Sequence, residues 1–423
     1  MSALPSSLPL DGVRVLDLSR VLAGPMCAMA LADLGADVVK VEHPGRGDDT
    51  RDWGVRVGQR NTSYFNSANR NKRSVTLDLQ AEEGLRIARE LAADSDVVIQ
   101  NFKVGGAEKL GLGYEQLSQL NPRLVYCSIS GYSRSGPEAT RPGYDLVVQG
   151  ESGIMAMNGE QGQGPLKFGV AAVDMFTGMY SAQAILAALY ERHSTGRGRH
   201  VQMALYDCGL MITSYYGMEA LLKAGDPPKF GNAHPSIVPY GVFEAADGPL
   251  VITVGNNGQF QRFCTDVIAK PEWAVDERFA TNTARSANRD LLMPLVQAEL
   301  LRFTRAQLLE CLTAAQIPCG EVLGLFEALN SQRTADAGLL HRFEDSEAGS
   351  QSVLAPPYAL DGQRLPVRRP PPHQGEHTDE VLQQRLGLDE QARAALRAKN
   401  IICERADVPT QTAPRLSFPP LPA

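Results

Sequence analysis

The sequence predicts an α/β fold with two domains: a large Rossmann-like domain built on a doubly wound, mostly parallel sheet, and a smaller α+β domain. Three observations support this prediction. Short apolar segments typical of buried strands alternate with helical segments in the first half of the chain, which is the pattern of βαβ units. A proline-bearing linker then precedes a strand-rich segment. At 423 residues the chain is also long enough for two domains.

The expected elements follow in chain order. A strand at Gly12–Leu18, a helix at Met26–Leu34 and a strand at Asp37–Glu42 form a first βαβ unit. The large domain continues with a helix at 85–92, strands at 96–100 and 124–129, a long helix after Asp174 and a strand at 200–205. The smaller domain has strands within 236–254 and helices around Trp273, at 291–301 and at 308–312; loops and a helix at about 378–386 follow.

These elements divide the chain into four segments. Residues 1–222 form the N-terminal part of the large domain, and residues 223–335 form the small domain. Residues 336–400 return to the large domain. The proline-rich residues 401–423 are expected to be a disordered tail, because they carry too little apolar surface to pack.

Composition excludes several classes of protein. A net charge of −7 argues against nucleic-acid binding, which needs a basic face. Seven scattered cysteines without a C-x-x-C pair suit a reducing compartment. No signal peptide and no apolar run of about 20 residues is present, so we expect a cytoplasmic protein without a membrane partner. His373 and His377 are spaced like a helical metal pair, but Pro372 and Gly375 disfavour the helix, so no metal is expected.

Two enzyme classes lack their motifs. Glu42, at the end of a strand, resembles the ribose-binding acid of nicotinamide enzymes, but Ser19–Pro25 has one glycine where the G-x-G-x-x-G fingerprint needs three. A serine hydrolase is unsupported because the chain has no G-x-S-x-G elbow.

Asp174 is the residue whose setting is most informative, because it lies where an apolar segment enters a long helix. One interpretation is a helix N-cap, a position that aspartate favours. The other is a nucleophile, since its neighbours Val173, Met175 and Phe176 are unusual for a solvated cap. A carboxylate held away from water can attack an acyl group to form an anhydride. The two interpretations are compatible.

A series of motifs resembles family III CoA-transferases, the CaiB/BaiF family. The resemblance extends in order from about residue 8 to 390 and rests on Leu22–Pro25, Leu34–Glu42, Arg46–Arg51, Asn69–Ser74, Ser130–Tyr132, Gly143–Asp145, the Asp174 segment, Thr195–Gly198 and Gly255–Phe260. It implies that Asp174 is the nucleophile, that CoA thioesters are substrates rather than a permanently bound cofactor, and that the protein is an interlocked homodimer.

The resemblance also implies two sets of binding residues. The residues implied to contact CoA are Val21, Ala23, His43, Leu77, Asn101, Phe102, Lys103 and Lys109. The family often has arginine where this chain has His43 and Lys109; lysine still binds phosphate as a point charge. The residues implied to contact the acyl or acceptor substrate are Leu22, Tyr144, Asn256, Asn257, Gly258 and Gln259. In the last four, two asparagines replace glycines of the family's loop and add amide donors; the alternative is a tight turn only.

Three functions stay open at this point. Ala233–Tyr240 and Gly255–Gln259 resemble the branch of the family that moves CoA from succinyl-CoA to glutarate, which implies a dicarboxylate acceptor. Cationic groups available for its second carboxylate include Arg20, Arg51, Arg70 and His234. A racemase or epimerase of acyl-CoA esters is the second candidate, but Tyr144 stands where racemases have histidine, and a phenol is a poor base at neutral pH. A non-catalytic CoA-binding protein is the third.

Overall fold

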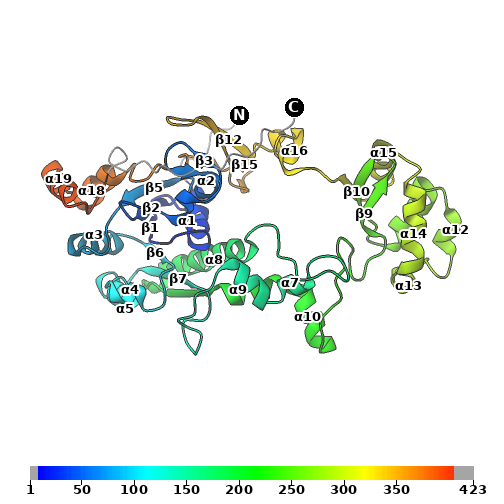
Figure 1. Cartoon of the computed structure of the whole chain (residues 1–423), viewed down its shortest axis with the longest axis horizontal. Helices are drawn as coiled ribbons and strands as arrows, with labels where there is room; N and C mark the ends of the chain where they lie inside the picture. The colour runs from blue at the N-terminus through cyan, green and yellow to red at the C-terminus, as the bar shows by residue number, and fades with distance from the viewer. Residues whose placement is uncertain (1–7, 404–423) are drawn as a thin grey trace. The chain divides into compact units, whose positions relative to one another are not determined.

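The computed structural model describes residues 8–403, and the chain forms two compact units (Figure 1). The first unit comprises the chain up to Ile154, Lys167–Gly217 and the chain from Gln332 onward. The second comprises Met155–Leu166 and Met218–Ser331. Of the predicted tail, residues 404–423 lie outside the described residues.

A six-stranded sheet forms the centre of the first unit. Its strands are β1 (Arg14–Asp17), β2 (Asp37–Glu42), β5 (Lys72–Thr76), β6 (Val97–Gln100), β7 (Val125–Ser130) and β8 (His200–Ala204). They are all parallel, in the order β5-β2-β1-β6-β7-β8. Numbered along the chain within this sheet, the order is 3-2-1-4-5-6, that of a doubly wound fold. The expected α/β class with a central parallel sheet is confirmed.

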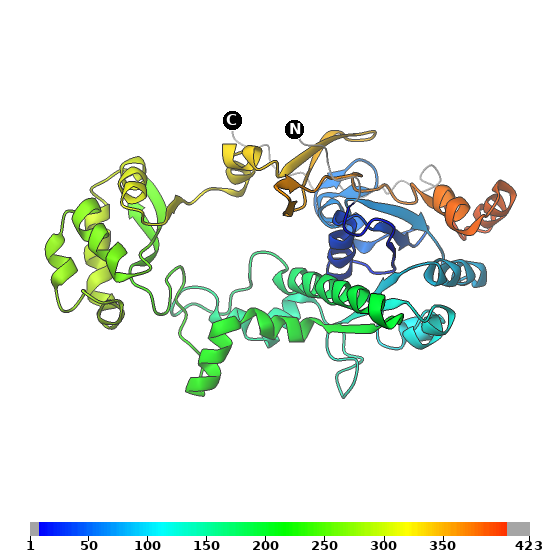
Figure 2. The same cartoon turned by 180° about the vertical axis from the view of Figure 1, so that it is seen from behind.

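Helices cover both faces of this sheet (Figures 1 and 2). Helices α1 (Ala23–Asp33) and α8 (Ala172–Thr195) pack on the face that Val15 joins, whereas Leu16 belongs to the core on the opposite face. That opposite face is covered by α3 (Glu82–Ala93), α5 (Tyr114–Leu120), α18 (Thr378–Leu386) and α19 (Glu390–Ala398). Ile401 and Ile402 are buried in this second core. These residues are therefore not part of a disordered tail, because their apolar side chains have a core to join.

The shorter elements of the first unit complete its loops. They are β3 (Arg56–Val57), β4 (Asn61–Thr62), α2 (Ser63–Ser67), α4 (Gly106–Lys109), α6 (Asp145–Glu151), α9 (Leu205–Ile212), α17 (Gln332–Asp336), β12 (Leu340–Asp345), β13 (Gly349–Leu354), β14 (Ala359–Leu360), β15 (Gln363–Arg364) and the 3₁₀ turn Asp49–Asp52. The antiparallel pair β12–β13 stands where the sequence predicted only loops.

Helix α8 is the most apolar long helix among the described residues. By length and composition alone it could cross a membrane, yet half of its apolar window is buried. Its close packing on α1 depends on Gly178, where an added Cβ would lie 2.7 Å from the carbonyl oxygen of Ala23. The helix is thus a core helix of the first unit.

The second unit has its own core. Three antiparallel strands, in the order β11-β10-β9, pack against helices. The strands are β9 (Tyr240–Ala245), β10 (Gly248–Thr253) and β11 (Cys319–Glu321); the helices of this part of the chain are α7 (Ile154–Met157), α10 (Ser214–Lys223), α11 (Asn257–Arg262), α12 (Pro271–Val275), α13 (Asn282–Ala287), α14 (Arg289–Leu300), α15 (Arg305–Ala314) and α16 (Leu325–Leu329), with a π-helical turn at Phe263–Val267.

Candidate active site

A cleft of about 590 Å³ opens at the carboxyl ends of the central strands. The strand order reverses between β1 and β6, and in doubly wound sheets ligands bind in the crevice at this switch point. The segments that follow β1, β6, β7 and β8 all contribute to the cleft. Its lining includes Arg20, Val21, Leu22, Ala23, Asn101, Phe102, Lys103, Lys109, Ser130, Arg141, Tyr144, Asp174 and Leu205.

Asn101 ties together the two loops that flank the switch point. Its side-chain carbonyl accepts a hydrogen bond from the backbone N–H of Arg20 at 2.9 Å, and its amide donates to the carbonyl oxygen of Arg20 at 2.8 Å. The next residue, Val21, has a φ of 72°, a region that β-branched residues rarely adopt. Its N–H donates to Asp48 at 3.3 Å. The loop before α1 is therefore held in one strained conformation.

Fully buried ion pairs lie beneath this loop. Lys40 pairs with Asp48 at 2.8 Å and donates to the carbonyl oxygen of Ser19 at 2.9 Å. Lys72 pairs with Asp17 at 3.0 Å and donates to the carbonyl oxygen of Pro25 at 2.9 Å. A buried charge is tolerated only when it is paired and hydrogen-bonded. Each lysine thus joins a carboxylate to one end of the cleft loop.

Asp174 lines the cleft from the first turn of α8, and its side chain is half-buried. No donor among the described residues bonds to its carboxylate. Burial, followed by the nearby carboxylate of Asp145, raises the pKa of Asp174 to about 7. A carboxylate that has lost water and gained no donor is more basic, and therefore more nucleophilic, than an ordinary aspartate.

The N-cap interpretation of Asp174 is wrong. The helix begins at Ala172, the capping position is Ala171, and no side chain of α8 itself caps it. Instead, Asp145 of α6 accepts hydrogen bonds from the backbone N–H groups of Val173 at 2.8 Å and Asp174 at 3.3 Å. The sequence analysis assigned no role to Asp145, because a cap supplied from another helix leaves no local pattern.

The segment that carries Tyr144 and Asp145 approaches the end of β7 closely. An added Cβ on Gly131 would lie 2.7 Å from the Cα atom of Gly143, so both positions require glycine. Tyr144 follows this contact, lines the cleft and is 63% exposed. Tyr64 of α2 is a further neighbour that sequence reasoning missed. Burial, and then Asp174 among three carboxylates, raises its pKa.

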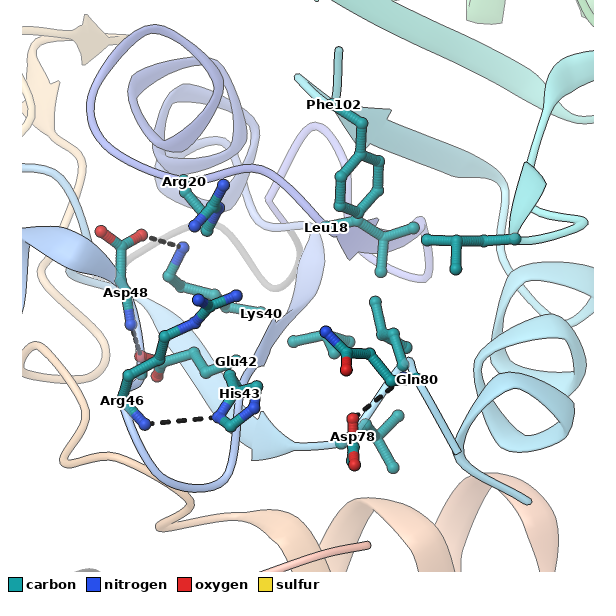
Figure 3. Close-up of a pocket in the computed structure, with 15 residues that line it drawn as sticks. Leu18, Arg20, Lys40, Glu42, His43, Arg46, Asp48, Asp78, Gln80 and Phe102 are labelled. Atoms are coloured by element: carbon teal, nitrogen blue, oxygen red, sulfur yellow. Dashed lines mark hydrogen bonds and ion pairs between the residues drawn. The ribbon is translucent and has the colours of Figure 1, made fainter. Parts of the chain in front are cut away.

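A second pocket of about 250 Å³ adjoins the cleft and shares Arg20 and Phe102 with it. Figure 3 shows Arg20, Lys40 and Arg46 on one side of it, with Leu18 and Phe102 on another. His43 and Leu77, two of the predicted CoA contacts, line this pocket. The other six line the cleft itself.

His43 does not give the second pocket the positive charge that an arginine at this position would supply. Its Nδ1 accepts hydrogen bonds from the N–H groups of Gly45 at 3.0 Å and Arg46 at 3.3 Å, so a proton on the ring belongs to Nε2. Burial and the neighbouring Arg46 lower the pKa of His43. At neutral pH this side chain offers a hydrogen-bond donor rather than a positive charge.

Three of the four predicted cations are not available to a substrate carboxylate. Arg51 is buried in a two-bond pair with Glu42, at 2.7 Å for each bond. Because Glu42 is bound to Arg51, the residue that resembles the ribose-binding acid of nicotinamide enzymes is not available to a ligand. Arg70 is buried against Asp33. Burial and Arg289 lower the pKa of His234, which is then neutral at pH 7. Only Arg20 lines the cleft, next to Asp49 at 3.0 Å.

The predicted substrate loop lies in the second unit, after β10, and only its first part is a loop: α11 begins at Asn257, and Asn256 caps this helix. Asn256 accepts a hydrogen bond from the N–H of Gln259 at 2.9 Å, and Gln259 accepts one from the N–H of Gly255 at 2.7 Å. Gly255, Asn256, Asn257 and Gly258 are exposed. The loop is therefore fixed by its own side chains while its outer surface stays open to solvent.

Fold and cleft together define a doubly wound α/β protein with a ligand site at its switch point. Residues 10–378 match the sequence model of a family described as CoA-transferase family III, and the chain belongs to that family. It is 41% identical over 380 residues to succinate–glutarate CoA-transferase of Agrobacterium fabrum, with 88% of this chain and 95% of the relative covered. It is 37% identical over 397 residues to succinyl-CoA:glutarate CoA-transferase of Mus musculus, with 94% and 91% covered.

Solved structures agree with the family. A CaiB/BaiF family protein from Brucella suis superposes with a TM-score of 0.79 at 41% identity, covering 90% of this chain and 100% of that chain. A protein from Mycobacterium tuberculosis gives a TM-score of 0.78 at 32% identity, covering 89% and 99%. The predictions of the family and of a CoA-transferase are confirmed.

Proposed function

We propose that this enzyme transfers CoA from succinyl-CoA to a dicarboxylic acid, with glutarate as the first acceptor to test. The names of its relatives from Agrobacterium fabrum and Mus musculus support these substrates. The observation that carries the proposal is the position of Asp174. This carboxylate has a pKa of about 7, receives no hydrogen bond within the described part of the chain, and lies in one cleft with six of the predicted CoA contacts.

The proposed reaction needs no cofactor beyond its CoA thioesters. The Asp174 carboxylate attacks the thioester carbonyl of succinyl-CoA, and the C–S bond breaks to give a succinyl-aspartyl anhydride and CoA thiolate. The thiolate attacks the aspartyl carbonyl, which releases succinate and leaves an aspartyl-CoA thioester. The acceptor carboxylate attacks that thioester, which releases CoA thiolate and forms an anhydride between the acceptor and Asp174. The thiolate then attacks the acceptor carbonyl of this anhydride, which gives the new CoA thioester and frees the Asp174 carboxylate.

CoA binding is proposed for both neighbouring pockets. Lys103 and Lys109 are exposed at the edge of the cleft and suit phosphate groups as point charges. Phe102 faces both pockets. Val21 and Ala23 bring backbone groups of the strained loop to the same cleft. The loop Asn256–Gln259 is proposed to bind the acceptor, because it presents amide groups.

We also propose that the protein is a homodimer. Apolar side chains near the nucleophile are exposed, among them Val170, Met175, Phe176 and Met179. Helix α10 buries none of its residues, and Leu221 and Leu222 on it are 77% and 84% exposed. Exposed apolar side chains on several helices support a protein interface. The seven cysteines form no disulfide within residues 8–403, which suits a cytoplasmic location.

A steady-state assay tests the function. Wild-type protein should form glutaryl-CoA from succinyl-CoA and glutarate, and Asp174→Ala and Asp174→Asn should each lower kcat by at least about 10⁴-fold, since neither side chain can form the anhydride. Both variants should keep the circular-dichroism spectrum of the wild type. Turnover at wild-type rate by either variant would overturn the role of Asp174.

A further inference from the structure

Arg285, in α13 of the second unit, is a fully buried cation without a carboxylate partner. Its side chain is 0% exposed, and no carboxylate within residues 8–403 forms an ion pair with it. Burial lowers its pKa to about 10, which leaves it charged at neutral pH. Burying a charge is costly unless hydrogen bonds satisfy it. The contacts of this guanidinium therefore call for an explanation beyond packing.

Each nitrogen of the guanidinium donates to a neutral oxygen. Nε donates to the carbonyl oxygen of Val238 at 2.6 Å, and Nη1 donates to that of Phe279 at 2.9 Å. Nη2 donates to the side-chain oxygen of Asn257 at 3.2 Å. The group also stacks over the ring of Phe260, 4.2 Å from its centre. Arg285 thus links the core of the second unit to the exposed loop.

These contacts fix which way the amide of Asn257 points. Its Oδ1 accepts two hydrogen bonds, one from Arg285 and one from the backbone N–H of Asn282 at 2.9 Å. The Nδ2 group therefore points away from both donors. Because Asn257 is exposed, its two N–H bonds are available to a ligand.

The electrostatics of the loop favour an anion. Arg285 places an uncompensated positive charge directly beneath Asn257. A second guanidinium stands beside the loop, since an added Cβ on Gly258 would lie 3.8 Å from Nη1 of Arg262. Arg262 donates from Nε to the carbonyl oxygen of Ala315 at 2.7 Å. A low-dielectric interior screens a buried charge less than water does, so its positive potential extends to the loop surface.

We infer that Asn257 donates a hydrogen bond to a carboxylate of the dicarboxylic acid, and that Arg285 is the positioning residue that orients this donor and supplies the attracting charge. The inference rests on the proposed function and makes it more specific. It assigns the recognition of the acceptor anion to one amide group and explains a buried arginine that the chemistry at Asp174 does not use.

Asn257→Asp gives the sharpest test, because its two expected effects have opposite signs. The new carboxylate can accept both existing hydrogen bonds and pair with Arg285, so the thermal unfolding midpoint should rise. The same change removes the N–H donor and adds a negative charge. The KM for glutarate should rise at least about tenfold, because the variant loses one charge-assisted hydrogen bond to the ligand. The Kd of free CoA, which carries no carboxylate, should change less than twofold. Asn330→Asp, an exposed asparagine in the same unit, is the matched charge control.

A double-mutant cycle tests the role of Arg285. Arg285→Lys keeps the charge but loses the geometry, and Asn257→Ala removes the donor. If Arg285 acts through Asn257, each variant raises the KM for glutarate and the double variant raises it no further than Asn257→Ala. Arg278→Lys, on an exposed arginine paired with Asp276, is the matched control. Should Arg285→Lys fail to fold, Asn257→Asp alone decides the question.

The outcomes separate this inference from the proposed function. Wild-type protein that transfers CoA to no dicarboxylic acid would end the proposed function. Wild-type transfer to glutarate, with an unchanged KM in Asn257→Asp, would leave the function standing and overturn the inference.

Discussion

Unlike Asp49 in the cleft and Asp48 in the adjoining pocket, Asp174 has no cation and no donor within residues 8–403. Asp48 is held by Lys40 at 2.8 Å, and Asp49 by Arg20 at 3.0 Å. Asp174 instead has a second carboxylate nearby, Asp145, which accepts hydrogen bonds from backbone N–H groups at the start of α8. The environment thus favours the protonated form of Asp174, and the ionised form of Asp174 is therefore more nucleophilic than an ordinary aspartate.

A pH profile follows from this pKa. The nucleophile is the ionised carboxylate, so with a pKa of about 7 the value of kcat/KM for succinyl-CoA should rise about tenfold per pH unit below pH 7 and level off above it. Asp145→Asn removes a like charge, which lowers the pKa of Asp174 and moves this limb to lower pH. A profile that is flat from pH 5 to 9 in the wild type would contradict the raised pKa.

At the level of single elements, the strands around the cleft differ in how well the sequence predicts them. Five of the six strands of the central sheet are apolar and were expected. β5 was not, because its buried side chains include Lys72, Arg73 and Ser74. Lys72 pairs with Asp17 on β1, two strands away, and Arg73 pairs with Asp37 on the neighbouring strand β2. A strand stabilised by ion pairs between distant residues carries no apolar pattern.

The residues of the candidate site also differ in how well the sequence predicts them. Motif order predicted Asp174 as the nucleophile and eight residues as CoA contacts, and the structure brings these residues to one cleft and its neighbouring pocket. The cap supplied by Asp145 and the burial of Arg51 and Arg70 depend on contacts between separate elements. A single sequence gives no signal for such contacts.

The conformation of the strained loop before α1 should depend on Lys40, which is buried beneath it. Lys40→Met leaves Asp48 buried without its partner, which should lower the free energy of unfolding by about 3 kcal/mol. Because Lys40 also holds the carbonyl oxygen of Ser19, the Kd of CoA should rise as well. Chemical denaturation and calorimetric titration measure the two effects. Lys399→Met, at an exposed pair with Glu83, is the control and should change neither. Wild-type CoA affinity in a folded Lys40→Met variant would show that the loop keeps its conformation without Lys40, which would contradict this prediction.

For the whole molecule, the exposed apolar helices predict association. Leu221→Glu places a charge on α10, where the wild-type leucine is 77% exposed. Sedimentation velocity should show a dimer for the wild type and a shift toward monomer for the variant, with loss of transferase activity. Leu120→Glu, on a leucine of α5 that is 59% exposed, should leave the dimer intact. A wild-type monomer with full activity would contradict the proposed assembly.

The central claim is covalent chemistry at Asp174, and trapping tests it most directly. Wild-type protein is mixed with succinyl-CoA, treated with hydroxylamine and mapped by mass spectrometry of the intact chain and its peptides. We expect a CoA adduct before hydroxylamine and a hydroxamate on Asp174 after it. Absence of any adduct on Asp174, together with exchange of the α-proton of an acyl-CoA in deuterated water, would contradict the transferase mechanism and favour an isomerase.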